Sequence, residues 1–394
     1  MSRSPTHGGS RPSAGAGAAS VDMGGLWTRV PWIWGPRLDL GAFVGSALLA
    51  LAVAALGAWL SPDGKVPVWT WLVFVLAVDV AHVWSTIFRT YLDVDELKKR
   101  PLVYAGLPAV CYLGGVLLHR HGTLTFWRTL AYLAVFHFVR QQAGWVAIYR
   151  ARAGERARLD RVIDNAVIYG ATLWPMLWWH THLPRAFHWF MPGDFVDLAW
   201  LRPLVTPLGT LYAMALCAYT ARSWWHVSEG HPVNVGKHAV VVSTAAIWFV
   251  GIVATDQDFT FTITNVTIHG IPYMVLLWVY ARERAPERPG SSLARLVGYG
   301  VGAFLAVILA LAFFEELLWD RFVWHERPGL FGGVKRDEPL LSDAALAWLV
   351  PALSLPQLVH YALDGVLWRS KDAGPAQGRA LGFLPSRVPT GPAT

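Results

Sequence analysis

The sequence predicts an all-α fold, a polytopic bundle of about ten transmembrane helices with both termini in the cytosol. The chain has 394 residues, of which 54% are hydrophobic and only 15% are charged. Soluble domains carry about 25% charged residues, so the deficit is large. Runs of eighteen or more mainly apolar residues recur along the chain, which is the signal of membrane-spanning helices. Positive side chains also concentrate in alternate connections, as expected of a chain that crosses a bilayer repeatedly.

The ends of the chain predict two tails around one transmembrane domain, residues 38–369. Residues 1–37 are rich in Gly, Ser, Pro and Arg, and they predict a disordered cytosolic tail because no apolar run precedes Leu38. Residues 370–394 have a similar composition and predict a second cytosolic tail.

Ten helices are predicted between the tails. In order, the predicted helices span 38–60, 66–88, 101–118, 125–149, 162–183, 203–225, 238–254, 260–281, 296–319 and 343–369. The third and seventh helices are short, and the fifth contains Pro175.

The distribution of Lys and Arg predicts the orientation of these helices. If the N-terminus is cytosolic, the cytosolic tails and loops carry 23 of the 33 Lys and Arg residues and the opposite loops carry 8. Such a bias is typical of membrane proteins, whose short cytoplasmic loops are enriched in positive charge. We therefore expect an integral protein of an inner or cytoplasmic membrane with its N-terminus in the cytosol.

Charge and cysteine content exclude several classes of partner and site. The net charge of +7 follows from the orientation bias and suits an anionic inner leaflet, so it does not indicate nucleic acid. The chain has two cysteines, Cys111 and Cys217, both within predicted spans. They cannot supply a disulfide framework or a cysteine-rich metal site.

Polar and ionisable residues recur inside four of the predicted spans. Such residues are costly at membrane depth, so they normally face the bundle interior and mark a site. They occur three or four residues apart, which places each pair on one helix face. The pairs are Asp79 with His82, His137 with Gln141, Asn265 with His269, and His360 with Asp364.

The predicted orientation places these four histidines at overlapping depths. His137 and His269 fall near the membrane midplane, and His82 and His360 fall in the cytosolic half. Neutral imidazole is the commonest protein ligand for metal ions, and a ligating histidine usually donates its second N–H to a carboxylate or carbonyl group. Sets of histidines with carboxylates suit non-haem iron, manganese or zinc.

Two other interpretations use the same residues. Intramembrane histidines can serve only as hydrogen-bonding groups between helices, in a structural membrane protein. They can also line a proton or ion pathway in a transporter or proton-coupled carrier. Against a carrier, the sequence shows no inverted repeat and no matching pair of broken helices.

Short motifs resemble a known class of membrane enzyme. The segments "FHF" (136–138) and "HYALDG" (360–365) are similar to motifs of the bacterial carotene-cleaving membrane oxygenases of the Brp/Blh type. Those enzymes are polytopic and hold iron with histidines from separate helices. The resemblance covers only these fragments, and it implies His82, His137, His269 and His360 as iron ligands.

The sequence therefore predicts a membrane-embedded, histidine-ligated metalloenzyme, an iron-dependent oxygenase, hydroxylase or desaturase. Its substrate would be a lipid or isoprenoid that enters from the bilayer, with a possible electron donor on the cytosolic side. Asp79 and Asp364 would bind the metal directly or orient the histidine ligands. Arg140 would pair with a carboxylate or a lipid headgroup, and His238 would complete a second metal site. The cofactor would be one or two iron ions, with haem or zinc as alternatives. The metal ligands would be His82, His137, His269, His360 and His238.

Overall fold

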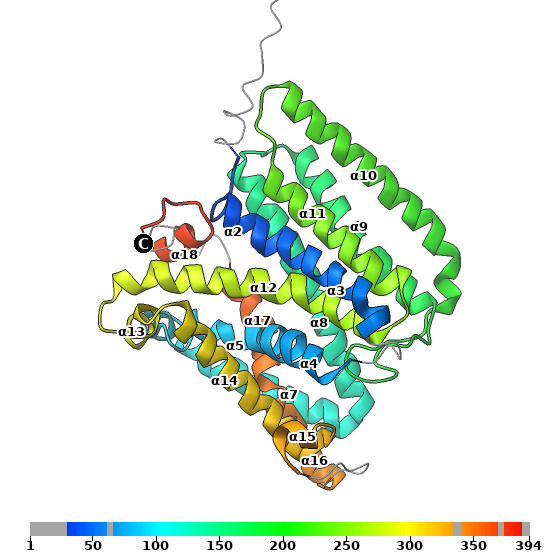
Figure 1. The fold of residues 1–394 in the computed structure, drawn as a ribbon, viewed down its shortest axis with the longest axis vertical. Helices are drawn as coiled ribbons and strands as arrows, with labels where there is room; N and C mark the ends of the chain where they lie inside the picture. Colours follow the sequence, from blue (N-terminus) through cyan, green and yellow to red (C-terminus); the bar gives the residue numbers. More distant parts are fainter. Residues whose placement is uncertain (1–29, 61–65, 334–339, 369–373, 388–394) are drawn as a thin grey trace, which may run out of the picture.

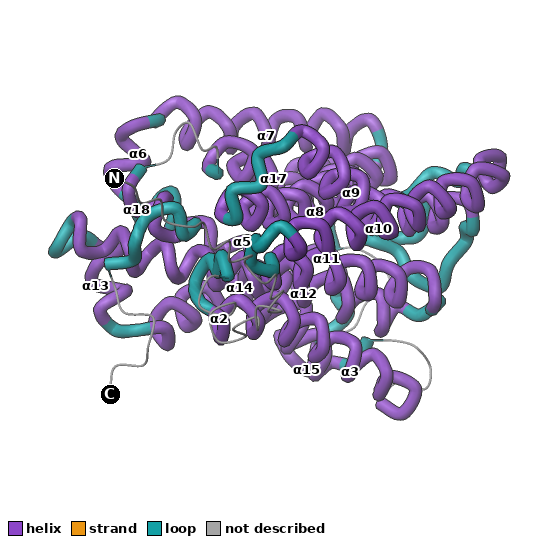
Figure 2. Tube along the Cα trace, turned by 90° about the horizontal axis from the view of Figure 1, so that it is seen from above, coloured by secondary structure: helices purple, strands orange, loops and turns teal. Residues whose placement is uncertain are grey.

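The computed structural model describes residues 30–60, 66–333, 340–368 and 374–387. Helices form all of its regular structure, and Figure 2 shows no strand among these residues. The all-α prediction is confirmed. Residues 1–29, 370–373 and 388–394 of the predicted tails, and residue 369 at the end of the last predicted helix, lie outside the described residues.

Each of the ten segments predicted to be helical is helical, although several are divided. The first half consists of α2 (Pro36–Leu40), η1 (Gly41–Gly45), α3 (Ser46–Leu60), α4 (Val68–Thr70), η2 (Trp71–Val80), α5 (Ala81–Ser85), η3 (Thr86–Phe88), α6 (Val94–Lys99), α7 (Pro101–His121), α8 (Thr123–Arg152) and α9 (Arg158–Thr181).

The second half begins with a short 3-10 turn and contains the central helix, α12. It consists of η4 (Ala199–Leu204), α10 (Val205–Ser228), α11 (Val235–Trp248), η5 (Phe249–Ala254), α12 (Asp258–Arg284), η6 (Ala285–Glu287), α13 (Ser292–Gly298), α14 (Val301–Trp319), η7 (Asp320–Trp324), α15 (Pro328–Phe331), α16 (Asp343–Leu353), α17 (Leu355–Leu367) and α18 (Pro375–Ala380).

Fewer helices than predicted are apolar enough to span a membrane. Seven helices have the required length and composition, and the pair α16–α17, bent by 42°, makes an eighth if it is one span. The predicted count of ten spans is not confirmed. The two that fall short are α8 and α9, whose many polar and aromatic residues make them less apolar than the other spans; each also carries four charged side chains along its length. The long apolar helices nevertheless indicate a multi-pass membrane protein.

Helix α12 lies at the centre of the bundle. In Figure 1 it crosses the middle of the molecule, with α3, α9, α10 and α11 on one side and α4, α5, α7 and α14 on the other. Within its most apolar window 67% of the residues are buried, against 17% for α7 and for α14. A helix in this position can present side chains to both groups of helices.

The C-terminal segment is packed against the end of α12, although the sequence predicts a tail there. Helix α18 is buried, and the Arg379 guanidinium donates to the Glu283 carboxylate over 2.8 Å. The Trp34 indole donates to the Ala380 carbonyl oxygen over 2.9 Å, which joins the segment before α2 to α18. Small residues and one buried ion pair allow this segment to pack where its composition suggests disorder.

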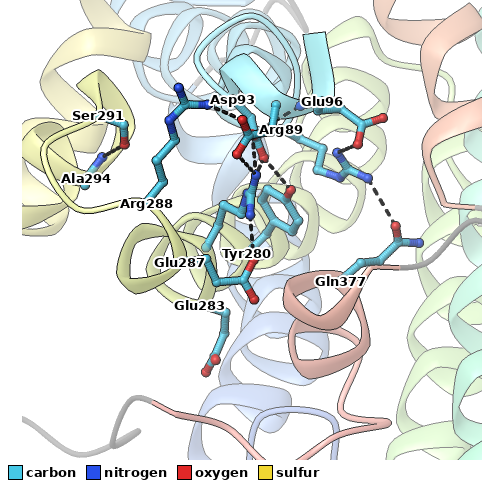
Figure 3. Close-up of polar contacts among 12 residues, drawn as sticks. Arg89, Asp93, Glu96, Tyr280, Glu283, Glu287, Arg288, Ser291, Ala294 and Gln377 are labelled. Atoms are coloured by element: carbon cyan, nitrogen blue, oxygen red, sulfur yellow. Dashed lines mark hydrogen bonds and ion pairs between the residues drawn. The ribbon is translucent and has the colours of Figure 1, made fainter. Parts of the chain in front are cut away.

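Polar contacts link α18 to the connection between η3 and α7. Figure 3 shows Arg89 between Glu96 and Gln377, with ion-pair and hydrogen-bond distances of 3.2 and 3.1 Å. Burial raises the pKa of nearby Asp93, but hydrogen bonds from Arg284 and Tyr280 outweigh this effect and leave the pKa below its ordinary value. This network fixes the end of the bundle to which the ligand-bearing helices η2–α5 and α12 run.

Candidate metal centre

Four histidines from four helices meet in the interior of the bundle. His82 comes from α5, His137 from α8, His269 from α12 and His360 from α17. Their exposed fractions lie between 0% and 5%, so the group is closed to bulk solvent. One ring nitrogen from each lies within 4.8 Å of the ring nitrogens offered by the other three.

The Nε2 atoms face one another in two close pairs. His269 Nε2 lies 3.0 Å from His82 Nε2, and His360 Nε2 lies 3.1 Å from His137 Nε2. Metal–nitrogen bonds of about 2.1 Å place two ligand nitrogens about 3.0–4.2 Å apart, depending on the angle between the bonds. The two close pairs fall in this range, and the four offered nitrogens, all within 4.8 Å of one another, could together hold one ion.

The Nδ1 contacts of His82 and His360 favour the tautomer in which Nε2 is unprotonated and available to a metal ion. His82 Nδ1 lies 3.3 Å from the Val78 carbonyl oxygen, which can only accept, so Nδ1 carries the proton of neutral imidazole. His360 Nδ1 lies 2.8 Å from the Thr86 hydroxyl oxygen. A second-side partner of this kind holds a ligating ring in one orientation.

His269 is held by packing. The Phe138 ring stacks on its imidazole with centroids 3.6 Å apart and an interplanar angle of 10°. Its Nδ1 is buried and has no hydrogen-bond partner among the described residues. If this ring is neutral with its proton on Nδ1, its Nε2 lone pair points to the centre of the cluster.

A hydrogen-bonded chain connects the cluster to Asp364. The Tyr273 hydroxyl donates to Asp364 Oδ1 over 2.5 Å and lies 3.2 Å from the Thr86 hydroxyl, which contacts His360. Trp368 Nε1 also donates to Asp364 Oδ1 over 3.2 Å. The second carboxylate oxygen lies 3.8 Å from His137 Nε2. Asp364 is thus positioned either to orient the ligands or to approach an ion directly.

Sequence reasoning did not identify Thr86 and Tyr273 in this chain of contacts. Each follows a cluster histidine by four residues, Thr86 after His82 and Tyr273 after His269. Residues four apart lie on the same helix face, so this spacing is the signal that identifies them.

The structure places the remaining predicted site residues as follows. Asp79 lies beside the cluster, with Oδ1 3.7 Å from His82 Nδ1. Arg140 is exposed and donates to the Tyr169 hydroxyl over 2.5 Å, outside the cluster. His238 Nδ1 lies 2.6 Å from the Tyr219 hydroxyl. Among the described residues, the four buried histidines are the group that can hold a metal ion, and His238 is not part of it.

Local helix geometry brings His82 and His269 together. The helix before His82 is π-helical from Trp71 to Val80, a form that is rare and often found at functional sites. Gly270, next to His269, lies directly against Val78 of this segment: a Cβ built on Gly270 would be 2.9 Å from the Val78 carbonyl oxygen. Glycine at this position lets α12 approach the helix that carries His82.

Gly270→Ala should therefore weaken metal binding without removing a ligand. The added methyl group must push α12 and η2 apart, because it meets backbone, and the His82–His269 spacing increases with them. We expect at least a tenfold weaker metal affinity, measured by competition with a coloured chelator. Gly144→Ala in α8 is the control, since a Cβ there meets nothing within 4 Å. Equal affinities in the two variants would contradict this reading of the helix contact.

Two cavities of different character lie at or beside the cluster. One, of about 270 Å³, is lined mainly by apolar side chains and by His360, and we call it the apolar cavity. The other, of about 500 Å³, includes five carboxylates and five tryptophans in its lining, and we call it the acidic cavity. Val83 lines both. The carboxylates of the acidic cavity are Asp79, Asp258, Glu315, Glu316 and Glu326.

The sequence is similar to that of a curated transferase. It is 24% identical over 197 residues to 4-hydroxybenzoate octaprenyltransferase of Xanthomonas euvesicatoria pv. vesicatoria (strain 85-10). The match covers 47% of this chain and 56% of the transferase, so the chain spans about half the length of this relative. No family model matches the chain, and no solved structure matches it.

Proposed function

We propose that this protein is a membrane-embedded metalloenzyme that oxidises a lipid or isoprenoid substrate at an iron ion held by its four clustered histidines. The observation that carries the proposal is the convergence of four buried imidazoles from four helices, with their Nε2 atoms facing one another. Burial of four titratable rings in one place is costly for a protein that only needs to hold helices together.

The donor set supports iron over the hard cations. Imidazole suits iron, zinc, copper and nickel, whereas magnesium and calcium prefer carboxylate and carbonyl oxygens. A bound iron ion would supply the redox chemistry by which molecular oxygen oxidises an otherwise unreactive carbon. The resemblance to histidine-ligated carotene-cleaving oxygenases agrees with this choice of metal.

The apolar cavity supports a substrate that comes from the bilayer. Its lining reaches from surface-exposed Tyr91 and Ala352 to the buried His360 ring. Val359 and Leu363, on the same helix as His360, form part of its wall. An isoprenoid or acyl chain gains about 0.8 kcal/mol for each CH₂ group removed from water, so such a cavity favours a hydrocarbon over a polar substrate.

The protein's own residues would then hold the reacting parts in place. Thr86 fixes the His360 ring through Nδ1, and Tyr273 joins Thr86 to Asp364. Phe138 covers one face of His269 and keeps water from it. These contacts hold the imidazoles in fixed orientations before any substrate arrives.

Metal analysis of the detergent-purified wild-type protein tests the proposal directly. We expect about one iron per chain after expression with added iron, and no Soret band, because four imidazoles converge on one point and leave no room for a haem plane. The apo-protein should take up Fe²⁺ or Co²⁺ with the same stoichiometry. Metal content near zero under both conditions would contradict the proposal.

Prenyl transfer is a second candidate, supported by the name of the similar transferase and by the acidic cavity. Carboxylates are the ligands that Mg²⁺ prefers when it binds a diphosphate group. This alternative makes a different prediction, that purified protein transfers a prenyl group from a prenyl diphosphate in Mg²⁺ and retains this activity when His137 and His269 are replaced. If the protein instead oxidises a lipid substrate, and this activity is lost when His137 and His269 are replaced, the result supports the oxygenase.

A further inference from the structure

The acidic cavity extends from one end of the bundle to residues that contact the histidine cluster. Its outer part is lined by residues near the N-terminal end of α12 and the C-terminal end of α14, among them Asp258 and Glu316. Its inner part is lined by Asp79 and Phe138, which contact His82 and His269. The cavity therefore runs from the region of these helix ends to the side chains that contact the predicted histidine ligands.

Its inner end is a layer of polar side chains one helical turn from the ligands. Asp79 precedes His82 by three residues, Asn265 precedes His269 by four, and Gln357 precedes His360 by three. All three line the acidic cavity. The three helix segments thus place an oxygen-bearing side chain between the cavity and an imidazole.

One member of this layer is unsatisfied. Asn265 is 3% exposed, and its Oδ1 has no hydrogen-bond partner among the described residues, although its Nδ2 donates to the Phe261 carbonyl oxygen over 2.9 Å. A buried amide oxygen without a partner costs about 1–3 kcal/mol. A cation, or a water molecule bound to one, is a partner that this oxygen can accept.

The charge of the cavity also indicates a cation. Five carboxylates line it against one guanidinium, that of Arg327, which pairs with Glu326 at 3.2 Å and lies over the Trp71 ring. A cleft lined by one sign of charge within low-dielectric walls concentrates ions of the opposite sign. Water and carboxylate oxygens are suited to a hydrated divalent cation in transit.

We propose that the acidic cavity is the path by which a hydrated divalent cation reaches the histidine cluster. This inference rests on the proposed function, because it assumes that the cluster holds a metal. Among the described residues, the four buried histidines form the group that lies closely enough together to hold an ion, and the carboxylates of the cavity do not form such a group. The carboxylates would therefore attract the cation, and the histidines would retain it. The oxygens of Asp79, Asn265 and Gln357 would receive the cation at the inner end of the cavity, and the four imidazoles would hold it.

Uptake of Co²⁺ by the full-length apo-protein tests this path. Binding to nitrogen ligands gives Co²⁺ visible absorption, so stopped-flow mixing follows the rate and the final amplitude gives the stoichiometry. We expect the double variant Glu315→Gln/Glu316→Gln to take up Co²⁺ about tenfold more slowly at low ionic strength, with an unchanged amplitude. High salt should reduce the difference, because it screens the attraction.

Asp343→Asn provides the matched control, since Asp343 is an exposed carboxylate that does not line the cavity. If the double variant does not fold, Glu316→Gln alone replaces it. If the wild type binds Co²⁺ and the Glu315→Gln/Glu316→Gln variant, or Glu316→Gln in its place, takes it up at the wild-type rate, the path is overturned and the metal centre stands. Absence of Co²⁺ binding by the wild type would overturn both proposals.

Discussion

Replacing His82 or His360 by alanine is expected to strip the purified protein of metal. Each change removes one of four converging nitrogens, and His360→Ala also frees the Thr86 hydroxyl that orients the ring. Loss of an outer partner alone costs about 10- to 100-fold in metal affinity, so loss of a ligand should cost more than about 100-fold. Elemental analysis of wild type, both single variants and the double variant measures the effect.

His180→Ala is the appropriate control for these variants. His180 is also buried, at 7% exposure, and its ring contacts the Tyr132 hydroxyl and the Met176 carbonyl oxygen instead of other histidines. Its loss should change stability but leave the metal content as in wild type. Elution as a single species on size exclusion ensures that each variant is folded.

The same series separates the metal centre from a structural role. If the four imidazoles only join helices through Nε2 hydrogen bonds, one ring of each pair must carry its proton on Nε2, and no ion is bound. His82→Ala would then lower the unfolding temperature without altering a metal content that is already near zero. A wild type with metal and a His82→Ala variant with the same amount would contradict the ligand assignment.

Hydropathy was sufficient to locate the helices, but not to count the spans. All ten predicted ranges are helical because long apolar runs leave the backbone no other way to satisfy its hydrogen bonds in a membrane. The sequence cannot show that the charges of α8 and α9 are accommodated within the bundle. Asp164 illustrates the difficulty, since its partners Arg150 and Lys237 come from two other helices.

Four of the five predicted metal ligands lie together because burial cost restricts where an imidazole is placed. His82, His137, His269 and His360 each interrupt an apolar span, and such residues face the interior. His238 lies in the first turn of α11, near the end of a span and away from the other histidines, and its ring contacts Tyr219 instead. Arg140 lies in the middle of a predicted span, but it is exposed on α8 and is not at the cluster, so the burial rule fails for this residue.

Glu315 and Glu316 show where single-sequence reasoning fails. Near the end of an apolar helix they are predicted to be solvated, but both line the acidic cavity, and Glu315 accepts a hydrogen bond from Trp84 over 2.7 Å. The partner is 231 residues away in the chain. Contacts of this kind depend on how helices are arranged, which hydropathy does not encode.

Replacing Asp364 should reveal whether this carboxylate binds the metal or orients its ligands. Asp364→Asn keeps an oxygen that can accept from Tyr273, but it removes the charge, whereas Tyr273→Phe keeps the charge and breaks the chain to Thr86. If Asp364 orients the ligands through this chain, both variants should bind metal about 10- to 100-fold more weakly. If it ligates directly, Asp364→Asn should have the larger effect and Tyr273→Phe a small one.

The double variant makes this distinction sharper. Substitutions within one hydrogen-bond network have effects on metal affinity that do not add up. An orienting role therefore predicts that Asp364→Asn/Tyr273→Phe binds metal only slightly more weakly than either single variant. Tyr219→Phe is the control, because it removes a buried hydroxyl that contacts His238, away from the cluster. Wild-type affinity in all of these variants would show that Asp364 acts on neither the ion nor its ligands. The 3.8 Å between Asp364 Oδ2 and His137 Nε2 would then be packing alone.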